Sequence, residues 1–343
     1  MLVIGLDVHK DSLAAVVVDH AGRQVDCGTF DNTDDGHTSL LAWANTHGAR
    51  LRIGMEPSGG VARRLAYRLE TAGHVVAEVQ PRLSRGEVNR LRTRGKTDPS
   101  DALAIARVVL REPNLPPVRQ AGISEDLKLL VDYRDQLFNE RTRIANRLHA
   151  DMAIAYPGYQ RTLGRVLTSR RALLAAQALI EGDQSCRADL SRRRIERLLA
   201  LDSESKALQR QIAHLVGQSD TTLMDVCGIG PIVAARILGE VGDVRRFPTE
   251  ATFAATNGTA PIAASSGRTE RHRLNRGGNR RLNYALYVIA ITQTRHEPRA
   301  AAYLAKRRAE GKTRREALRG LKRHLSNVVY RRLIADVQTT LDT

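Results

Sequence analysis

The sequence predicts an α/β domain at the N-terminus, a helical coiled-coil middle and a mainly α C-terminal domain. Strand-like segments separated by turn signals fill residues 2–30, and helix-like and strand-like segments alternate after them. Residues 111–118 contain three prolines, which end a helix and mark a boundary. The chain of 343 residues is also too long for one compact core, so we expect domains at 1–117, 118–217 and 218–343.

The first of these domains is predicted to be a mixed sheet with helices on its faces. Its first three strands, V-I-G-L-D, L-A-A-V-V-V-D and R-Q-V-D-C-G-T-F, form a meander. A helix near 36–46, a strand R-I-G-M-E, a helix near 61–72 and a strand H-V-V-A-E-V follow. Strands in front of a β-α-β alternation have the element order of an RNase H-like core.

The middle domain carries a leucine seam. Leu201, Leu208 and Leu215 are seven residues apart, and an earlier helix could be the antiparallel partner of this segment through Leu127, Leu130, Leu137, Ile144 and Leu148. Two interpretations remain open: an amphipathic hairpin that packs on its own chain, or a dimer interface.

The charge of the chain predicts a polyanionic partner. The formal net charge is +17 and the sequence pI is about 10.5. Lys and Arg bound to phosphates release condensed counterions, so a nucleic acid is the leading candidate. Residues 261–343 hold 19 Lys and Arg against 6 Asp and Glu, which makes the C-terminal third the expected contact surface for the phosphate backbone.

The cysteines and the hydropathy pattern favour a soluble protein of the cytoplasm. Cys27, Cys186 and Cys227 lie far apart without a C-x-x-C spacing, so neither a disulfide framework nor a zinc site is indicated. The chain opens directly into a strand-like run, and no apolar stretch reaches the roughly 18 residues of a membrane span.

Four carboxylates form a pattern that suits two metal ions. Asp7 and Glu56 each end an apolar run, in neighbouring strands of the expected sheet, and Asp98 and Asp101 lie in K-T-D-P-S-D-A. Metal ions about 3.5–4 Å apart can clamp both oxygens of a phosphodiester displacement, and acidic oxygen ligands suit Mg²⁺, with Mn²⁺ as the alternative ion. Asp98 and Asp101 also have a structural alternative, because they would cap a helix that starts at Pro99.

Two motifs near the C-terminus suggest contacts with nucleic acid. Gly228, Gly230 and Ala234 have the spacing of a helix-hairpin-helix, in which glycine amides meet a phosphate, although a plain packing turn has the same spacing. Residues 260–283 are rich in arginine, and guanidinium groups bind phosphates in a bidentate manner. The arginines expected to do so are Arg268, Arg271, Arg273, Arg276, Arg280 and Arg281.

The same stretch contains Ser265 and Ser266, which on spacing alone could be ordinary loop residues. Tyr284 and Tyr287 follow at i, i+3 on the next helix, and we expect them in the core.

Taken together, these motifs resemble the transposases of the IS110 family. The resemblance rests on G-L-D-V-H-K, G-M-E-P-S-G, K-T-D-P-S-D-A, G-I-G-P and A-P-x4-S-G with R-G-G-N-R-R-L-N, and it spans almost the entire chain. It implies that residues 1–117 form a RuvC-like domain whose D-E-D-D metal site is Asp7, Glu56, Asp98 and Asp101. It also implies a serine nucleophile in the last domain, before Gly267, which is Ser266 with Ser265 beside it.

The resemblance implies further properties of the reaction and its partners. A covalent phosphoserine link would preserve the bond energy while strands are exchanged. Donor and target DNA would be recognised through a structured guide RNA encoded by the element. The enzyme would act as a homodimer or homotetramer, in the cytoplasm of a prokaryote at its nucleoid. The serine of one subunit would meet the carboxylates of another.

Three rival functions stay open from the residues. A RuvC-like endonuclease or junction resolvase would use a metal-bound water in place of the serine. An architectural nucleic-acid binder would keep the fold without chemistry. A sugar-kinase-like ATPase shares the opening meander, but the sequence has no second meander with a phosphate loop.

Overall fold

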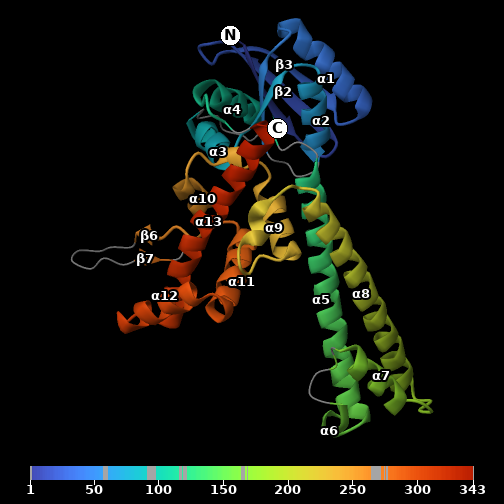
Figure 1. The fold of residues 1–343 in the computed structure, drawn as a ribbon. Coiled ribbons are helices and arrows are strands. Elements are labelled where there is room, and N and C mark those ends of the chain that lie inside the picture. Colours follow the sequence, from blue (N-terminus) through green and yellow to red (C-terminus); the bar gives the residue numbers. More distant parts are fainter. Residues whose placement is uncertain are drawn as a thin grey trace. The chain divides into compact units, whose positions relative to one another are not determined.

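The computed structural model describes residues 2–56, 61–90, 98–115, 118, 122–163, 167, 169–263, 272–273, 275 and 277–342. The chain divides into two compact units (Figure 1). Unit 1 comprises Met1–Gly122 with Asp243–Pro248, and unit 2 comprises Ile123–Gly242 with Thr249–Thr343. The division into three domains at 117 and 217 stays a prediction.

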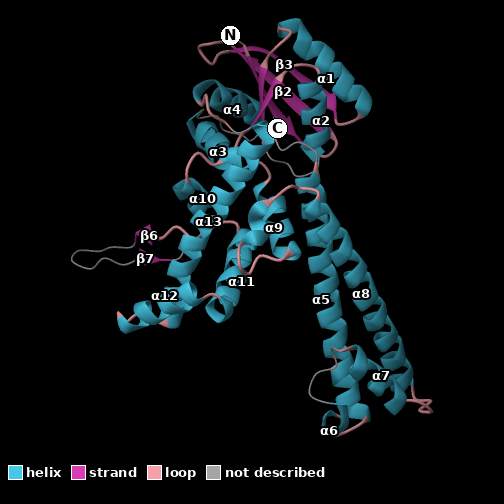
Figure 2. Ribbon diagram, in the orientation of Figure 1, coloured by secondary structure: helices cyan, strands magenta, loops and turns pink. Residues whose placement is uncertain are grey.

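Unit 1 contains a sheet whose strands are magenta in Figure 2. The sheet has five strands in the order β3-β2-β1-β4-β5. Antiparallel pairing joins β1 to β2 and β2 to β3, while β4 pairs parallel with both β1 and β5. The predicted meander and mixed sheet are therefore confirmed, and the topology is that of an RNase H-like core. The strands are β1 (Val3–Val8), β2 (Ser12–Val18), β3 (Gln24–Asp31), β4 (Arg52–Met55) and β5 (Val75–Glu78).

Helices cover both faces of this sheet because the central strands are apolar on both sides. On one face Ile4 and Leu6 of β1 share a buried cluster with α1 (Asp34–His47) and α2 (Val61–Thr71). On the other face Val3 belongs to a second cluster, with α4 (Asp98–Arg111) and the partly buried Leu83 of α3 (Pro81–Arg90). The sequence did not predict α3.

Unit 2 begins with a long antiparallel hairpin of α5 (Ile123–Ala155) and α8 (Cys186–Gly217). Ion pairs along it join Arg141 to Asp202 and Arg187 to Asp151, which fixes the antiparallel direction. Of the predicted seam, Leu127, Leu137, Leu148, Leu201 and Leu208 are buried within this chain, and Leu130, Ile144 and Leu215 are half-buried. The interpretation as a hairpin that packs on its own chain is confirmed for these residues.

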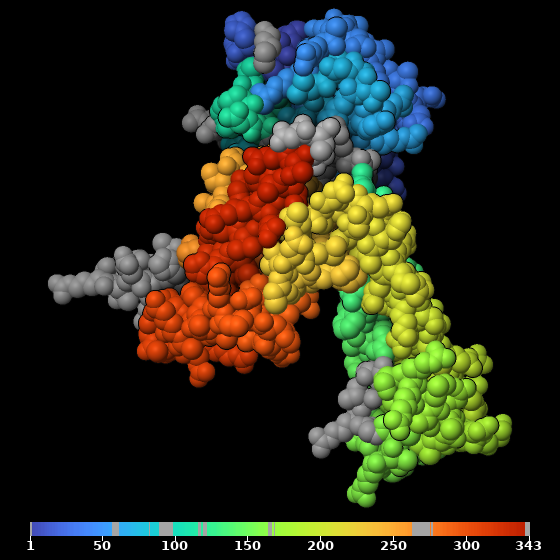
Figure 3. Space-filling model, viewed as in Figure 1, coloured from blue at the N-terminus to red at the C-terminus, as the bar shows by residue number. Residues whose placement is uncertain are grey.

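The far end of the hairpin carries α6 (Gln160–Leu163) and α7 (Arg170–Leu179). In the space-filling view this green end stands clear of the orange and red helices of the same unit (Figure 3).

The remainder of unit 2 is a helical group built around α11 (Arg280–His296). The other elements are the 3-10 helix η1 (Thr222–Asp225), α9 (Pro231–Val241), α10 (Glu250–Thr256), the short strands β6 (Ile262–Ala263) and β7 (His272–Arg273), α12 (Pro298–Ala309) and α13 (Arg314–Asp342). The 3-10 helix η2 (Val244–Arg246) lies in the part of unit 1 that interrupts this group. Among the described helices, none combines the length and the apolar character that a bilayer span requires.

Candidate active site

Asp7 lies on the central strand and on the face that α4 covers. Side chains alternate along a strand, so Asp7 shares a face with Gly5, two residues earlier. The Gly5 position touches α4 so closely that an added Cβ would lie 2.1 Å from the carbonyl oxygen of Ala102. The side chain of Asp7 is 15% exposed, and its Oδ2 lies 3.1 Å from Nε2 of His9.

Glu56 comes directly after β4, beside Asp7. The parallel register pairs Leu6 with Met55, so the next residue of each strand is one of the two acids. A Cβ on Gly54 would lie 2.0 Å from a side-chain carbon of α4, which puts Gly54 on the face that α4 covers. Ser84 of α3 donates a hydrogen bond to Glu56 Oε1, and α3 packs on that same face.

The direction of α4 brings its first turn to the same end of the sheet. Its residue Ala102 packs on Gly5, near the middle of β1. At the opposite end Arg52, which starts β4, donates hydrogen bonds to the carbonyls of Val109 and Glu112 at 2.9 and 2.8 Å. The helix therefore runs antiparallel to β1 and β4, and its N-terminus lies toward the ends of these strands.

Asp98 and Asp101 occupy this first turn of α4. Asp101 has a half-buried side chain, whereas the side chain of Asp98 is outside the described part of the structure. The fold thus brings Asp7, Glu56 and the acidic turn of α4 to one end of one sheet. Carboxylate oxygens are the donors that Mg²⁺ prefers, so this set fits a divalent cation by its chemistry.

The described side chains do not form a complete set of metal ligands. Among them, with Asp98 left out, no group of three His, Cys, Asp or Glu is arranged to hold a metal ion. The assignment of all four acids as ligands therefore stays a prediction. Sequence analysis did not find the contacts of His9 with Asp7 and of Ser84 with Glu56. The Ser84 contact depends on helix α3, which was not predicted.

The serine stretch falls mostly outside the described residues. Ser265, Ser266, Arg268, Arg271 and Arg276 lie there, as does the side chain of Arg273. Their roles stay predictions.

The described residues on both sides of this stretch make specific contacts. The strands β6 and β7 pair antiparallel, with Ile262 opposite Arg273. Farther on, Gly278 packs so closely on Gly258 that an added Cβ would lie 2.4 Å from the Gly258 nitrogen. Asn275 Nδ2 also donates to the carbonyl of Ala255 at 3.0 Å.

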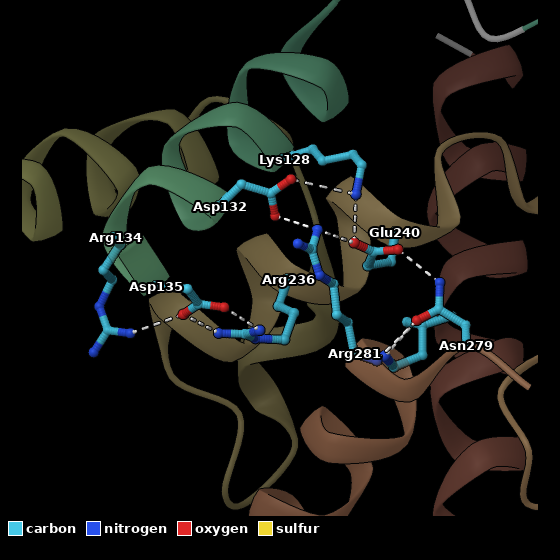
Figure 4. Close-up of polar contacts among 9 residues, drawn as sticks. Lys128, Asp132, Arg134, Asp135, Arg236, Glu240, Asn279 and Arg281 are labelled. Atoms are coloured by element: carbon cyan, nitrogen blue, oxygen red, sulfur yellow. Dashed lines mark hydrogen bonds and ion pairs between the residues drawn. The ribbon is translucent and has the colours of Figure 1, made fainter. Parts of the chain in front are cut away.

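The end of the stretch is tied to a cluster of charges at the start of α11 (Figure 4). Asn279 caps α11, accepting hydrogen bonds from the backbone N–H groups of Arg281 and Leu282. Its Nδ2 donates to Glu240 Oε2 at 2.6 Å, while Glu240 Oε1 lies 2.5 Å from Lys128 Nζ and 3.2 Å from Arg281 Nη1. Three segments more than 30 residues apart in sequence therefore meet at one carboxylate.

The cluster favours the ionised form of Glu240. Its side chain is 9% exposed, and burial by itself would raise its pKa. Hydrogen bonds from Lys128 and Asn279 outweigh the burial and hold the pKa of Glu240 below its usual value. Asp132 on α5 is a second acceptor, because it pairs with both Arg281 and Lys128.

The glycine turn before α9 contains one residue in the left-handed region. Gly228 adopts φ +89°, and an added Cβ would lie 3.1 Å from the carbonyl oxygen of Ile289 on α11. Gly230 is the N-cap of α9, and Ala234 is fully buried. These facts fit a helix-hairpin-helix and a plain packing turn equally, so contact of Gly228 and Gly230 with a phosphate stays a prediction.

The tyrosines of α11 correct one expectation. Tyr284 and Tyr287 are 56% and 43% exposed, so their predicted place in the core was wrong. The core face of α11 is formed by Leu282, Ala285, Leu286 and Ile289.

Comparison with known proteins relates both ends of the chain to transposases. One family model, described as a transposase and named for the DEDD domain of IS110, matches residues 4–157. Another, described as the transposase family of IS116, IS110 and IS902, matches residues 220–305. Together the two models match more than half of the chain.

Individual relatives match over nearly the full length. The protein of insertion element IS116 from Streptomyces clavuligerus is 24% identical, over 95% of this chain and 93% of its own. The IS900 protein of Mycobacterium paratuberculosis is 26% identical, with 95% and 94% covered, and the pilin gene-inverting protein of Moraxella lacunata is 23% identical, with 95% and 94% covered. Among solved structures, Thermus thermophilus RuvC matches at 16% identity and a TM-score of 0.28, covering 34% of this chain and 100% of that chain.

Proposed function

The chain belongs to the IS110 family of insertion-sequence transposases, and from this premise we propose that it cleaves and rejoins DNA through a phosphoserine formed on Ser266. Two observations support the proposal: the family match covers both units, and the fold brings Asp7, Glu56 and the first turn of α4 to one sheet end. The relative named a pilin gene-inverting protein also points to a reaction that rejoins DNA after cutting it.

The four acids are proposed to hold Mg²⁺, with Mn²⁺ as the alternative. Asp7 and Glu56 would supply ligands from adjacent strands, and Asp98 and Asp101 from one helical turn. Such an ion polarises the scissile phosphate and lowers the proton affinity of a hydroxyl. Other side chains of this protein must orient the acids and position the serine near them.

The serine step exchanges one phosphodiester for another. The Oγ of Ser266 bonds to phosphorus while the bond from phosphorus to the 3′ oxygen breaks, and the proton of the hydroxyl ends on the released 3′-hydroxyl. A 3′-hydroxyl of the partner strand then attacks the phosphoserine and returns the proton to Ser266. Each bond broken is replaced, so no ATP is needed.

The partners that we propose are donor and target DNA and a structured guide RNA encoded by the element. The excess of 19 Lys and Arg over 6 Asp and Glu in residues 261–343 supports binding of more than one polyanion. Arg280 and Arg281 at the start of α11, with Arg268, Arg271, Arg273 and Arg276, are the proposed phosphate contacts, together with the amides of Gly228 and Gly230. The enzyme is proposed to act as a homodimer or homotetramer in a prokaryotic cytoplasm, with the serine of one subunit meeting the acids of another.

A covalent adduct is the decisive test. Purified protein is incubated with the element ends, the flanking RNA and Mg²⁺, and protease-sensitive protein–DNA adducts are mapped by mass spectrometry. We expect the adduct on Ser266, its loss in Ser266→Ala and in Asp7→Asn, and its persistence in the matched variant Ser265→Ala. Cleavage that continues in Ser266→Ala without an adduct would replace the serine by water, as in a junction resolvase. Full activity of Asp7→Asn would contradict the proposed acid site.

A further inference from the structure

Two tyrosines on α11 form an aromatic surface that the core does not use. Tyr284 and Tyr287 are 56% and 43% exposed, and their ring centroids lie 6.4 Å apart with an interplanar angle of 29°. Aromatic residues make up only 4% of this chain, and α11 presents two of them together on one exposed face. A nearly parallel, exposed pair therefore suggests a ligand with a flat face of its own.

A buried cation fixes one side of this surface. The guanidinium of Arg236 on α9 lies 5.6 Å from the centroid of the Tyr284 ring, a cation–π contact. Arg236 is 7% exposed and donates two hydrogen bonds of 2.8 Å to Asp135 on α5. Because a bidentate ion pair holds the cation, the Tyr284 ring is supported from one side before any ligand binds.

Exposed arginines flank the tyrosines on the same face of the helix. Arg280 precedes Tyr284 by four residues and Arg295 follows Tyr287 by eight, and both side chains are exposed. Among the described residues, neither arginine pairs with a carboxylate. At 1.5 Å per residue the four side chains cover about 22 Å of helix, with cations at both ends and rings between them.

We propose that this tyrosine platform, Tyr284 and Tyr287 flanked by Arg280 and Arg295, stacks unpaired bases of a DNA strand. Every base presents a flat face to an aromatic ring once it has left the duplex stack, while its phosphates are attracted to the flanking arginines. Bases inside a duplex keep their faces covered by neighbours, so duplex DNA gains nothing from the rings. DNA is the substrate class of the family, and strand exchange leaves bases unpaired. The inference does not depend on Ser266 or on the four acids.

The test compares binding of single-stranded and duplex DNA by fluorescence anisotropy, in EDTA so that no cleavage occurs. We expect Tyr284→Leu with Tyr287→Leu to weaken binding of an oligo-dT by about 10-fold, and the double Phe variant to bind within about twofold of the wild type. The matched control is Tyr67→Leu, since Tyr67 is 61% exposed on α2 in unit 1. The steepness of log affinity against log salt should stay unchanged in the Leu variant. In Arg280→Gln the slope should become less negative by about 0.7, because one phosphate contact is lost.

Three outcomes would overturn the platform. They are an unchanged affinity of the Leu variant for oligo-dT, an equal loss for duplex DNA, and a loss confined to an oligo-rU of the same length. Circular dichroism checks that the variants are folded. A second measurement uses the wild-type protein: photocrosslinking to an oligonucleotide that carries 5-iododeoxyuridine should label Tyr284 or Tyr287, and labels found only elsewhere would contradict the proposal. Since Asp7→Asn should bind oligo-dT normally, failure of the catalytic proposal is distinguishable from failure of this one.

Discussion

Replacing Glu240 by glutamine tests whether the ion cluster at the start of α11 holds unit 2 together. The carboxylate is 9% exposed and accepts hydrogen bonds from Lys128 of α5 and from Asn279, the cap of α11. Glutamine keeps the shape and removes the charge. Lys128 and Arg281 then share Asp132 as their remaining carboxylate.

The expected loss of stability is moderate, because Lys128 and Arg281 keep their ion pairs with Asp132. Removing one partner of a fully buried ion pair costs about 3–5 kcal/mol. Here Lys128 and Arg281 are 24% and 45% exposed, so water screens the charges that are left over. We therefore expect Glu240→Gln to lower the free energy of unfolding by about 2 kcal/mol, or the melting temperature by about 6 °C for a unit of this size.

Differential scanning calorimetry measures this loss, and its pH dependence identifies the cause. The pKa of Glu240 lies below 4.5, its ordinary value, so its ionisation stabilises the folded state above that pH. The stabilisation is lost as the pH falls through the folded-state pKa. The difference between wild type and variant should therefore be full at pH 7 and shrink below about pH 4.5.

A matched substitution separates the cluster from ordinary surface charge. Glu250 of α10 pairs with Arg331, which is 71% exposed, so Glu250→Gln should cost less than about 0.5 kcal/mol. Equal losses in the two variants, or a difference for Glu240→Gln that persists undiminished at pH 3.5, would refute the reasoning.

Three further outcomes are expected. Gly5→Ala should lower the free energy of unfolding of unit 1 by about 3 kcal/mol and abolish Mg²⁺-dependent cleavage, because its Cβ would lie 2.1 Å from a carbonyl oxygen of α4. Gly86→Ala, with open space around it, should change neither the stability measured by calorimetry nor the cleavage measured in a nicking assay. Gly228→Ala should destabilise by about 1–3 kcal/mol through its φ of +89°. Gly230→Ala, an N-cap change at φ −91°, should cost less in the same calorimetry, about 0.5 kcal/mol. Burial lowers the pKa of His74 below its ordinary 6.5, so stability should fall as the pH drops below 6.5, and urea titrations of His74→Gln should show a flatter dependence.

The placement of the acids could be predicted because it follows from local rules. Apolar runs that end in Asp7 and Glu56 define two strands, and a parallel register puts the residues after Leu6 and Met55 side by side. The helix α3 could not be predicted, since P-R-L-S-R-G-E-V-N-R has a glycine and few apolar residues. Tertiary packing of Leu83 overrides that weak propensity.

The tyrosines show why periodicity alone misleads on a helix with two apolar stripes. Leu282, Leu286 and Ile289 recur at helical spacing just as Tyr284 and Tyr287 do, and only one stripe can face the core. The aliphatic stripe is buried, which leaves the aromatic one in solvent. The cluster at Glu240 lay beyond sequence analysis for another reason: its members come from α5, α9 and α11, and Lys128 and Glu240 are 112 residues apart.

The two proposals meet on α11, because one rigid helix carries both the end of the serine stretch and the tyrosine platform. Asn279 caps this helix and is held by Glu240, and Tyr284 follows five residues later, about 7.5 Å along the axis. A DNA strand stacked on Tyr284 would thus lie on the helix whose N-cap, Asn279, is held by Glu240. Arg236 and Glu240 lie four residues apart on α9, and each forms an ion pair with α5. The same two helices therefore support both proposed sites, through different residues. Because Arg236 and not Glu240 contacts the Tyr284 ring, a change at Glu240 should disturb chemistry at Ser266 more than stacking at Tyr284.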